Sequence, residues 1–252
     1  MERVAAMGLS AMEVQFVRQV RMAGEKAIEA GSKAKERGVL LSAHAPYYIN
    51  FNSKDASIRR KSEEWVLKSA RAGHNLGAWV VVVHAAHYGD SSSDRCTAAV
   101  MASLERCRAR MEEEGVEDVL IGLECMGRRT AWGTLQEIGE VVGRIEGVVP
   151  VVDFAHLHAR GGGSLRTEED FRQVLEEVDR FYQGRLHCHF SGIEFTEVGE
   201  RRHLPLSSRQ PDYRMLAGAL RERKGEVTLI SETPSPADGA REMVSLLRTT
   251  HG

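Results

Sequence analysis

Seven short apolar runs, rich in β-branched residues, recur along this chain, and longer stretches with helical periodicity lie between them. The intervening stretches, such as residues 57–77 and 97–115, carry apolar residues three and four positions apart and end in a glycine that suits a helix C-cap. Near-continuous Val and Ile within a run predicts a strand buried on both faces, as in a parallel sheet covered by helices. The pattern therefore predicts an α/β fold. The runs are AMEVQF (11–16), VLLSAHA (39–45), WVVVVHAA (79–86), VLIGLEC (119–125), VVPVVDFAH (148–156), RLHCHFS (185–191) and VTLISETP (227–234).

The number of runs and the length of the chain favour one parallel architecture. At 252 residues the chain has about the length of one complete α/β barrel, although two small domains would also fit. No linker or shift in composition divides the sequence, so we expect a single domain over residues 1–252 that folds as a TIM-type (β/α)8 barrel. The opening residues, MERVAAMG, look like the end of a helix that leads into the first run. We therefore expect a barrel that lacks its first strand.

Composition and charge exclude several other classes of protein. Hydrophobic residues make up 42% of the chain, and no segment approaches the roughly 18 uninterrupted apolar residues of a membrane span. Because the pattern of a signal peptide is also missing, we expect a cytoplasmic protein with no membrane partner. The four cysteines form no C-x-x-C pair and are expected to be reduced. With a net charge of −2, DNA binding would depend on a local basic surface. Residues 127–130 and 199–209 are candidates, and charged surface loops are the plainer interpretation of both.

Residues of the types that can bind metals, namely His, Glu and Asp, lie at or just after the ends of six successive apolar runs. In a parallel barrel the carboxyl ends of all strands meet at one face, so these residues are predicted to converge on one cavity. Each alone is more often a hydrogen-bonded core or rim residue, but six such ends in succession conflict with the cost of burying unpaired polar groups. Divalent ions would offset that cost, and imidazole with carboxylate suits zinc first, with manganese or iron behind it. The residues are His44, His84, Glu124, Asp153, His156, His189 and Glu232.

Several segments, taken in order, resemble the endonuclease IV family of apurinic/apyrimidinic endonucleases, which belongs to the wider xylose-isomerase-like TIM barrels. The resemblance covers the chain from about residue 4 to about residue 236, and its most specific element is the D-x-x-H pair of Asp153 and His156. The segments are HAPYYINF, VVVHAAHYG, LECMGRRTAWGTL, VVDFAHLHARGG, HCHFSG, RRHLPL and ISETP.

The resemblance implies a centre of three zinc ions, with manganese as the alternative metal. His44 and His84 would hold the first ion, Asp153, His189 and Glu232 the second, with Glu124 bridging those two, and His156 and His203 the third. The family also places an aspartate two residues before the histidine matched by His203, and here that position is Arg201. Glu200, one residue earlier, could take its place after a small loop shift. Three possibilities therefore stay open for the third site: it binds its ion more weakly, it uses Glu200 as a ligand, or it is empty.

The implied activity is hydrolysis of DNA 5′ to abasic sites in base excision repair, by a monomer acting on damaged double-stranded DNA. Bound zinc can lower the pKa of water from about 15.7 to about 7, so no serine or cysteine nucleophile is required. The attacking hydroxide is assigned to the zinc pair bridged by Glu124, with Glu232 orienting or deprotonating it.

Three further residues match family positions that contact the DNA. Tyr47 and Tyr48 match residues that enter the duplex around the damaged nucleotide, and Arg21 matches an arginine that fills the gap in the base stack. The plainer interpretations are rim packing for the tyrosines and a solvated loop position for Arg21.

Two other functions stay open at this stage. A sugar isomerase or epimerase of the same superfamily would move a proton between adjacent carbons with one or two divalent metals. It would use Glu124, Asp153, His189 and Glu232, and would leave His44, His84, His156 and His203 without roles. A metal-stabilised scaffold or DNA-binding protein that has lost turnover is the third possibility, suggested by Arg201 and the missing strand. Metal content would separate the first two, because the endonuclease needs two to three zinc ions.

Overall fold

The computed structural model describes residues 1–22 and 24–249 of the chain. These residues form two compact units. The first consists of Met1–Glu124 and Thr130–Val149, and the second of Cys125–Arg129 and the described residues from Pro150 onward.

Four parallel strands form the sheet of the first unit, in the order β1-β2-β3-β4. They are β1 (Ala11–Gln15), β2 (Leu40–His44), β3 (Val80–Val83) and β4 (Leu120–Glu124). The register aligns Gln15 with His44 and Val83 with Leu123, so the carboxyl ends of neighbouring strands lie side by side. All four valines of β3 are fully buried, as expected for a central strand covered on both faces.

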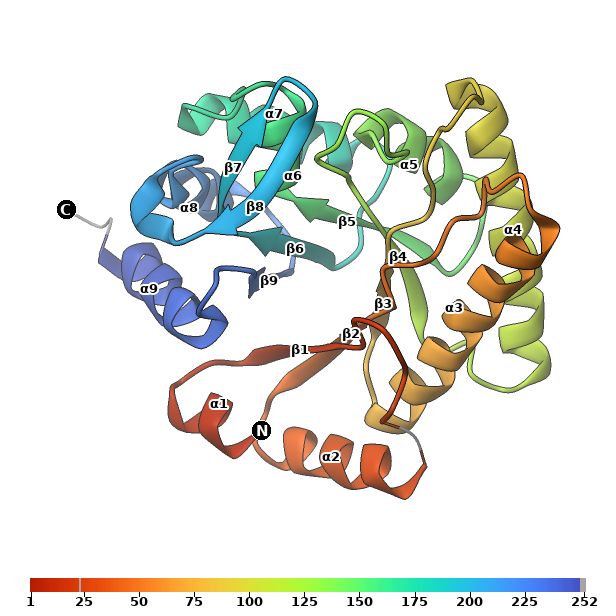
Figure 1. The fold of residues 1–252 in the computed structure, drawn as a ribbon. Helices are drawn as coiled ribbons and strands as arrows, with labels where there is room; N and C mark the ends of the chain where they lie inside the picture. Colours follow the sequence, from red (N-terminus) through yellow and green to blue (C-terminus); the bar gives the residue numbers. More distant parts are fainter. Residues whose placement is uncertain (23, 250–252) are drawn as a thin grey trace. The chain divides into compact units, whose positions relative to one another are not determined.

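Five helices belong to the first unit, and their ends follow local capping rules. They are α1 (Glu2–Ala6), α2 (Glu25–Glu36), α3 (Ala56–Leu76), α4 (Ser93–Glu113) and α5 (Leu135–Val142). Helix α3 begins after Asp55, whose carboxylate accepts a hydrogen bond from the Ser57 backbone N–H at 2.7 Å, and ends at Gly77 with φ of 66°. Helices α2 and α4 both pack against α3 (Figure 1).

The second unit continues the alternation of strand and helix. Strand β5 (Val148–Asp153) begins in the first unit and ends in the second, where the parallel order is β5-β6-β9. The other strands are β6 (Leu186–Phe190) and β9 (Val227–Ser231), and the helices are α6 (Phe154–Arg160), α7 (Glu168–Asp179), α8 (Tyr213–Glu222) and α9 (Pro236–Thr249). An antiparallel hairpin of β7 (Gly192–Thr196) and β8 (Gly199–Leu204) packs against α6, and a short 3₁₀ helix, Leu206–Ser208, follows it (Figure 1).

The seven parallel strands and their helices confirm the predicted TIM barrel type with one strand fewer than eight. Residues 1–10 contain helix α1 and no strand, as the opening sequence predicts. The hairpin was not predicted: residues 199–209, interpreted above as a loop, supply strand β8 instead. In the part of the chain that the structure describes, no helix has the length and apolar character needed to cross a bilayer.

Glu137, the buried third residue of helix α5, organises the loop before it. Its carboxylate accepts hydrogen bonds from the Tyr88 hydroxyl at 2.7 Å, the Ser93 hydroxyl at 2.5 Å and the Gly133 and Thr134 backbone N–H groups at 3.1 and 2.9 Å. Burial by itself would raise the pKa of Glu137. The hydrogen bonds from Ser93, Thr134 and Tyr88 stabilise the charged carboxylate more strongly, so the pKa of Glu137 lies below its usual value.

Replacing this carboxylate should therefore destabilise the fold in a pH-dependent way. We expect Glu137→Gln to lower the free energy of unfolding by about 1.5–3 kcal/mol at pH 7, because charge-assisted hydrogen bonds are lost. With a lowered folded-state pKa, the unfolded chain binds the proton first as the pH falls, so the difference from wild type should shrink below about pH 4.5. Urea unfolding at several pH values measures this. Glu140→Gln, which removes an exposed carboxylate on the same helix, should have almost no effect, and an equal loss in both variants would contradict the assignment.

Candidate metal centre

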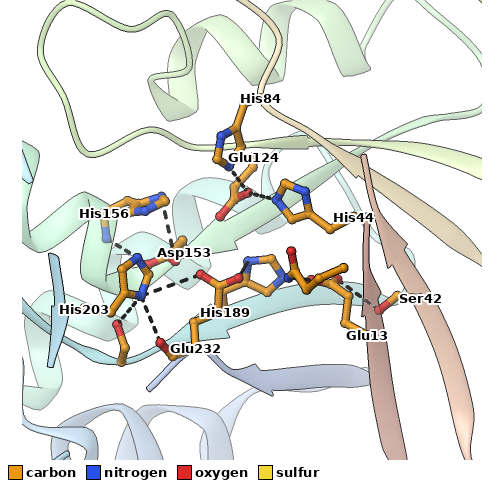
Figure 2. Close-up of polar contacts among 12 residues, drawn as sticks. Glu13, Ser42, His44, His84, Glu124, Asp153, His156, His189, His203 and Glu232 are labelled. Atoms are coloured by element: carbon orange, nitrogen blue, oxygen red, sulfur yellow. Dashed lines mark hydrogen bonds and ion pairs between the residues drawn. The ribbon is translucent and has the colours of Figure 1, made fainter. Parts of the chain in front are cut away.

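The first unit holds a compact group of two imidazoles and a carboxylate. His44 is the last residue of β2, His84 follows β3, and Glu124 is the last residue of β4. Glu124 Oε2 lies 3.1 Å from His44 Nε2 and 2.7 Å from His84 Nε2 (Figure 2). Glu124 is only 1% exposed. Three consecutive strand ends thus place potential metal ligands within reach of one ion.

A backbone hydrogen bond orients the first of these imidazoles. His44 Nδ1 lies 2.8 Å from the carbonyl oxygen of Ala45. Because a carbonyl oxygen only accepts hydrogen bonds, Nδ1 donates this one, and in the neutral ring that leaves the Nε2 atom beside Glu124 able to bind a cation. This is the tautomer that a metal-binding histidine needs, so the residues fit a divalent cation.

Tyr47 lies beside this group, both tyrosines are exposed, and Arg21 lies in the loop after β1. The Tyr47 ring centroid is 5.0 Å from that of His44 and 5.3 Å from that of His84, and its hydroxyl donates to Gln15 Oε1 at 2.9 Å. Tyr47 is 44% exposed and Tyr48 is 59% exposed. The Tyr48 side chain lines a surface hollow together with Arg18 and Lys61. Exposure of this kind leaves the tyrosine rings accessible to a ligand.

The second unit gathers a larger set of imidazoles and carboxylates (Figure 2). Asp153 ends β5, His156 lies in α6, His189 lies in β6, His203 lies in β8 and Glu232 follows β9. His189 Nδ1 is 3.6 Å from Glu232 Oε1, His203 Nδ1 is 3.7 Å from Glu232 Oε2, and the His156 and His203 ring centroids are 5.6 Å apart. The five residues come from five different elements, and the structure brings them together within this unit.

Asp153 shows most directly that this cluster suits a cation. One carboxylate oxygen, Oδ1, caps α6 by accepting the His156 backbone N–H at 2.8 Å. The other, Oδ2, is buried, accepts no hydrogen bond among the described residues, and lies 3.7 Å from His156 Nδ1. A fully buried carboxylate with an unsatisfied oxygen is costly. A divalent ion would satisfy it.

Four contacts support the ligands, and the two that involve backbone carbonyls carry no sequence signal. His156 Nδ1 donates to the carbonyl oxygen of Cys125 at 3.0 Å, and the Asp153 backbone N–H donates to Cys125 Sγ at 3.1 Å. His203 Nδ1 lies 3.1 Å from the carbonyl oxygen of Glu232 and 2.9 Å from Ser191 Oγ. Since two of these acceptors are backbone carbonyls, no residue type in the sequence marks them.

His187 illustrates why two histidines on one strand could not be told apart by sequence. It lies two residues before His189, is also fully buried, and its ring is 5.2 Å from that of His189. In the second unit it is His189 that reaches Glu232. That His189 rather than His187 is the ligand stays a prediction. The ion pair between His189 and Glu232 supports it.

The strands, the helices and these two clusters define a class of parallel barrels with candidate metal ligands at the carboxyl ends of their strands. The chain belongs to the family of xylose isomerase-like TIM barrels, whose family model matches residues 1–250.

Among sequence relatives, an uncharacterized protein of Methanocaldococcus jannaschii is 31% identical over 234 residues, covering 90% of this chain and 83% of that protein. A protein named probable endonuclease 4, from Mycobacterium leprae, is 26% identical over 220 residues, covering 85% of this chain and 80% of its own length. Its counterpart from Mycobacterium tuberculosis is 26% identical over 213 residues, with coverage of 84% and 79%.

Solved structures similar to this chain include proteins of different activity. A D-tagatose 3-epimerase-like protein has a TM-score of 0.74 at 18% identity, over 100% of this chain and 94% of that one. Endonuclease IV from Thermus thermophilus has a TM-score of 0.72 at 20% identity, over 98% and 92%. The IOLI protein, solved with a zinc atom, has a TM-score of 0.70 at 17% identity, over 98% and 91%. At these identities the likeness shows the shared fold.

All four cysteines are buried, which limits their access to reagents. Burial raises the pKa of Cys96, Cys107 and Cys188 to about 12, so almost none of each is thiolate at neutral pH. We expect a colorimetric disulfide reagent at pH 8 to label no thiol of the native protein and four thiols in guanidinium chloride. Rapid reaction of one equivalent in the native protein would contradict this environment.

Proposed function

We propose that this protein is a zinc-dependent phosphodiesterase that hydrolyses DNA 5′ to abasic sites, as in base excision repair. The observation that carries the proposal is the cluster of His44, His84 and Glu124, a ligand set that exists in addition to the cluster of the second unit. Phosphodiester hydrolysis suits a centre with more than one divalent ion, because charge on the phosphate and on the leaving oxygen is stabilised together. The relatives named probable endonuclease 4 support the same choice.

In the proposed centre His44 and His84 would hold one ion and Asp153, His189 and Glu232 a second, and the resemblance assigns Glu124 to both. When bound, the zinc ions supply Lewis acidity that activates water and neutralises the phosphate. The backbone carbonyls behind the imidazoles fix which ring nitrogen is available. The Glu232 carboxylate orients the attacking water and accepts its proton.

Damaged double-stranded DNA is the proposed substrate, and the exposed aromatic side chains beside the first cluster are the proposed contacts. Tyr47 and Tyr48 can stack on bases next to the lesion, and Arg21 can fill the space of the missing base. Arg18 and Lys61, which line the hollow under Tyr48, add positive charge for the phosphate backbone. With a net charge of −2 over the whole chain, these two cations are the proposed local basic surface.

A sugar isomerase or epimerase is the second candidate function. It is favoured by the pairing of Asp153, His189 and Glu232 in one unit, since two carboxylates and an imidazole suffice to hold one ion for proton transfer between adjacent carbons. In this alternative His44 and His84 have no role.

Replacing Glu232 tests the proposed hydrolysis. We expect Glu232→Gln to reduce incision of an abasic duplex by about 10²–10⁴-fold, because the amide cannot accept the proton of the attacking water. The assay follows cleavage of an end-labelled oligonucleotide with one abasic analogue. Glu242→Gln, on the exposed face of α9, should retain wild-type activity. Full incision by the Glu232 variant would remove this residue from the mechanism.

Metal content separates the two candidate functions. Elemental analysis of the purified protein should find two to three zinc ions per chain, and His44→Asn should lower that number by about one, because one ligand of the first ion is lost. His74→Asn, which changes a partly exposed histidine paired with Asp118, should leave it unchanged. A single exchangeable manganese or magnesium ion would favour the isomerase instead.

Removing the side chains proposed to contact DNA should weaken substrate binding more than it slows the chemical step. The double change Tyr48→Ala with Arg21→Ala is expected to raise KM for the abasic duplex about tenfold or more with little change in kcat, because base stacking is worth roughly 1–3 kcal/mol per base. The exposed Arg248→Ala serves as the control on α9. An unchanged KM in the double variant would show that these side chains are only solvated.

A further inference from the structure

The hairpin of β7 and β8 contains an irregularity in its pairing. Ile193 pairs with His203, whereas Phe195 pairs with Glu200. From the first pair to the second, β7 advances by two residues and β8 by three. Strand β8 therefore has one extra residue between these pairs. This is a β-bulge, which changes the face to which the following side chains point.

The bulge directs both arginines of β8 away from the ligand cluster. Arg202 Nε lies 2.6 Å from Glu194 Oε2, and Arg201 Nη1 lies 2.8 Å from Glu194 Oε1. Successive residues of a regular strand point to opposite faces, yet these two share one carboxylate and have side chains 72% and 66% exposed. Position 201, where the resemblance places an aspartate, therefore faces solvent.

Glu200 takes the inward position instead. Its side chain is only 17% exposed, and Oε2 lies 3.2 Å from His156 Nε2. This oxygen is buried and makes no hydrogen bond within the part of the chain that the structure describes. The other oxygen lies 3.7 Å from Arg128 Nε, whose side chain is 59% exposed, so that ion pair is weak.

Two glycines provide the space that Glu200 occupies. A Cβ atom at Gly127 would come 2.1 Å from Glu200 Oε2, and a Cβ atom at Gly199 would come 2.3 Å from the Gly127 carbonyl oxygen. Gly199 also has φ of 111°, a conformation that other residues rarely adopt. The close approach of Glu200 to His156 thus depends on the local backbone as well as on the bulge.

The nearby imidazoles present the correct nitrogen to a cation. His156 Nδ1 donates to the Cys125 carbonyl oxygen, so the Nε2 atom that faces Glu200 carries the lone pair. His203 Nδ1 donates to the Glu232 carbonyl oxygen, which gives His203 the same tautomer. Figure 2 shows these two rings close to each other, with their centroids 5.6 Å apart.

We propose that Glu200, brought inward by the β-bulge, replaces the missing aspartate and binds a third divalent cation together with His156 and His203. The proposal rests on the metal centre proposed above, and it assigns to this chain a carboxylate ligand three residues before the histidine rather than two. Buried carboxylate and imidazole are ligands that zinc accepts.

Zinc titration of the whole protein, without DNA, tests this assignment. We expect wild type to bind three zinc ions by calorimetry, and Glu200→Gln to bind two or to bind the third at least tenfold more weakly. Glu197→Gln, an exposed residue in the turn of the same hairpin, should behave as wild type. Thermal unfolding of the zinc-free proteins establishes that each variant is folded. Three ions bound equally well by Glu200→Gln, or only two by wild type, would overturn the assignment.

A double variant tests the role of the bulge itself. Because position 201 faces solvent, adding Arg201→Asp to Glu200→Gln should not recover the third ion. Recovery of wild-type affinity would show that position 201 reaches the metal and would overturn the argument from strand register. Incision measured on the same preparations keeps the two proposals apart: a wild-type protein that binds three zinc ions without cutting abasic DNA contradicts only the proposed function.

Discussion

Carboxylates buried among imidazoles at the carboxyl ends of parallel strands are the constraint on which the rest of this structure depends. Asp153 is fully buried and Glu124 nearly so, and an ionised carboxylate in such a place costs several kcal/mol unless opposite charge or hydrogen bonds compensate it. Imidazole nitrogens lie within 3.7 Å of both. Divalent ions would complete that compensation in the proposed centre, because the same nitrogen and oxygen atoms are good metal ligands.

The strand ends that deliver the ligands also orient them. The carbonyl oxygens of Ala45, Cys125 and Glu232 belong to residues immediately after a strand, and each accepts a hydrogen bond from a histidine Nδ1. These carbonyl groups lie at the strand ends, and in a neutral ring they favour the tautomer whose Nε2 can bind an ion. Such preorganisation lowers the cost of ordering the side chains on metal binding.

A D-tagatose 3-epimerase-like protein and an endonuclease IV share the fold of this chain. A shared fold does not fix the reaction, which depends on the residues of the site. Here the residues that bear on the choice are His44 and His84 in one unit and those of the β7–β8 hairpin in the other. These elements, rather than the parallel strands, support the proposed choice of a phosphodiester substrate.

The sequence by itself determined the alternation of strands and helices, the seven parallel strands and the residue types at the strand ends, because periodicity and burial are local properties of a strand such as Val80–Val83. It also placed His44, His84 and Glu124 at the ends of consecutive parallel strands, where they meet. Only the tertiary structure decided which residue of β8 faces inward. Strand register depends on pairing with β7 and on the space left by Gly127, and a single extra residue at the bulge turns Arg201 outward and Glu200 toward His156.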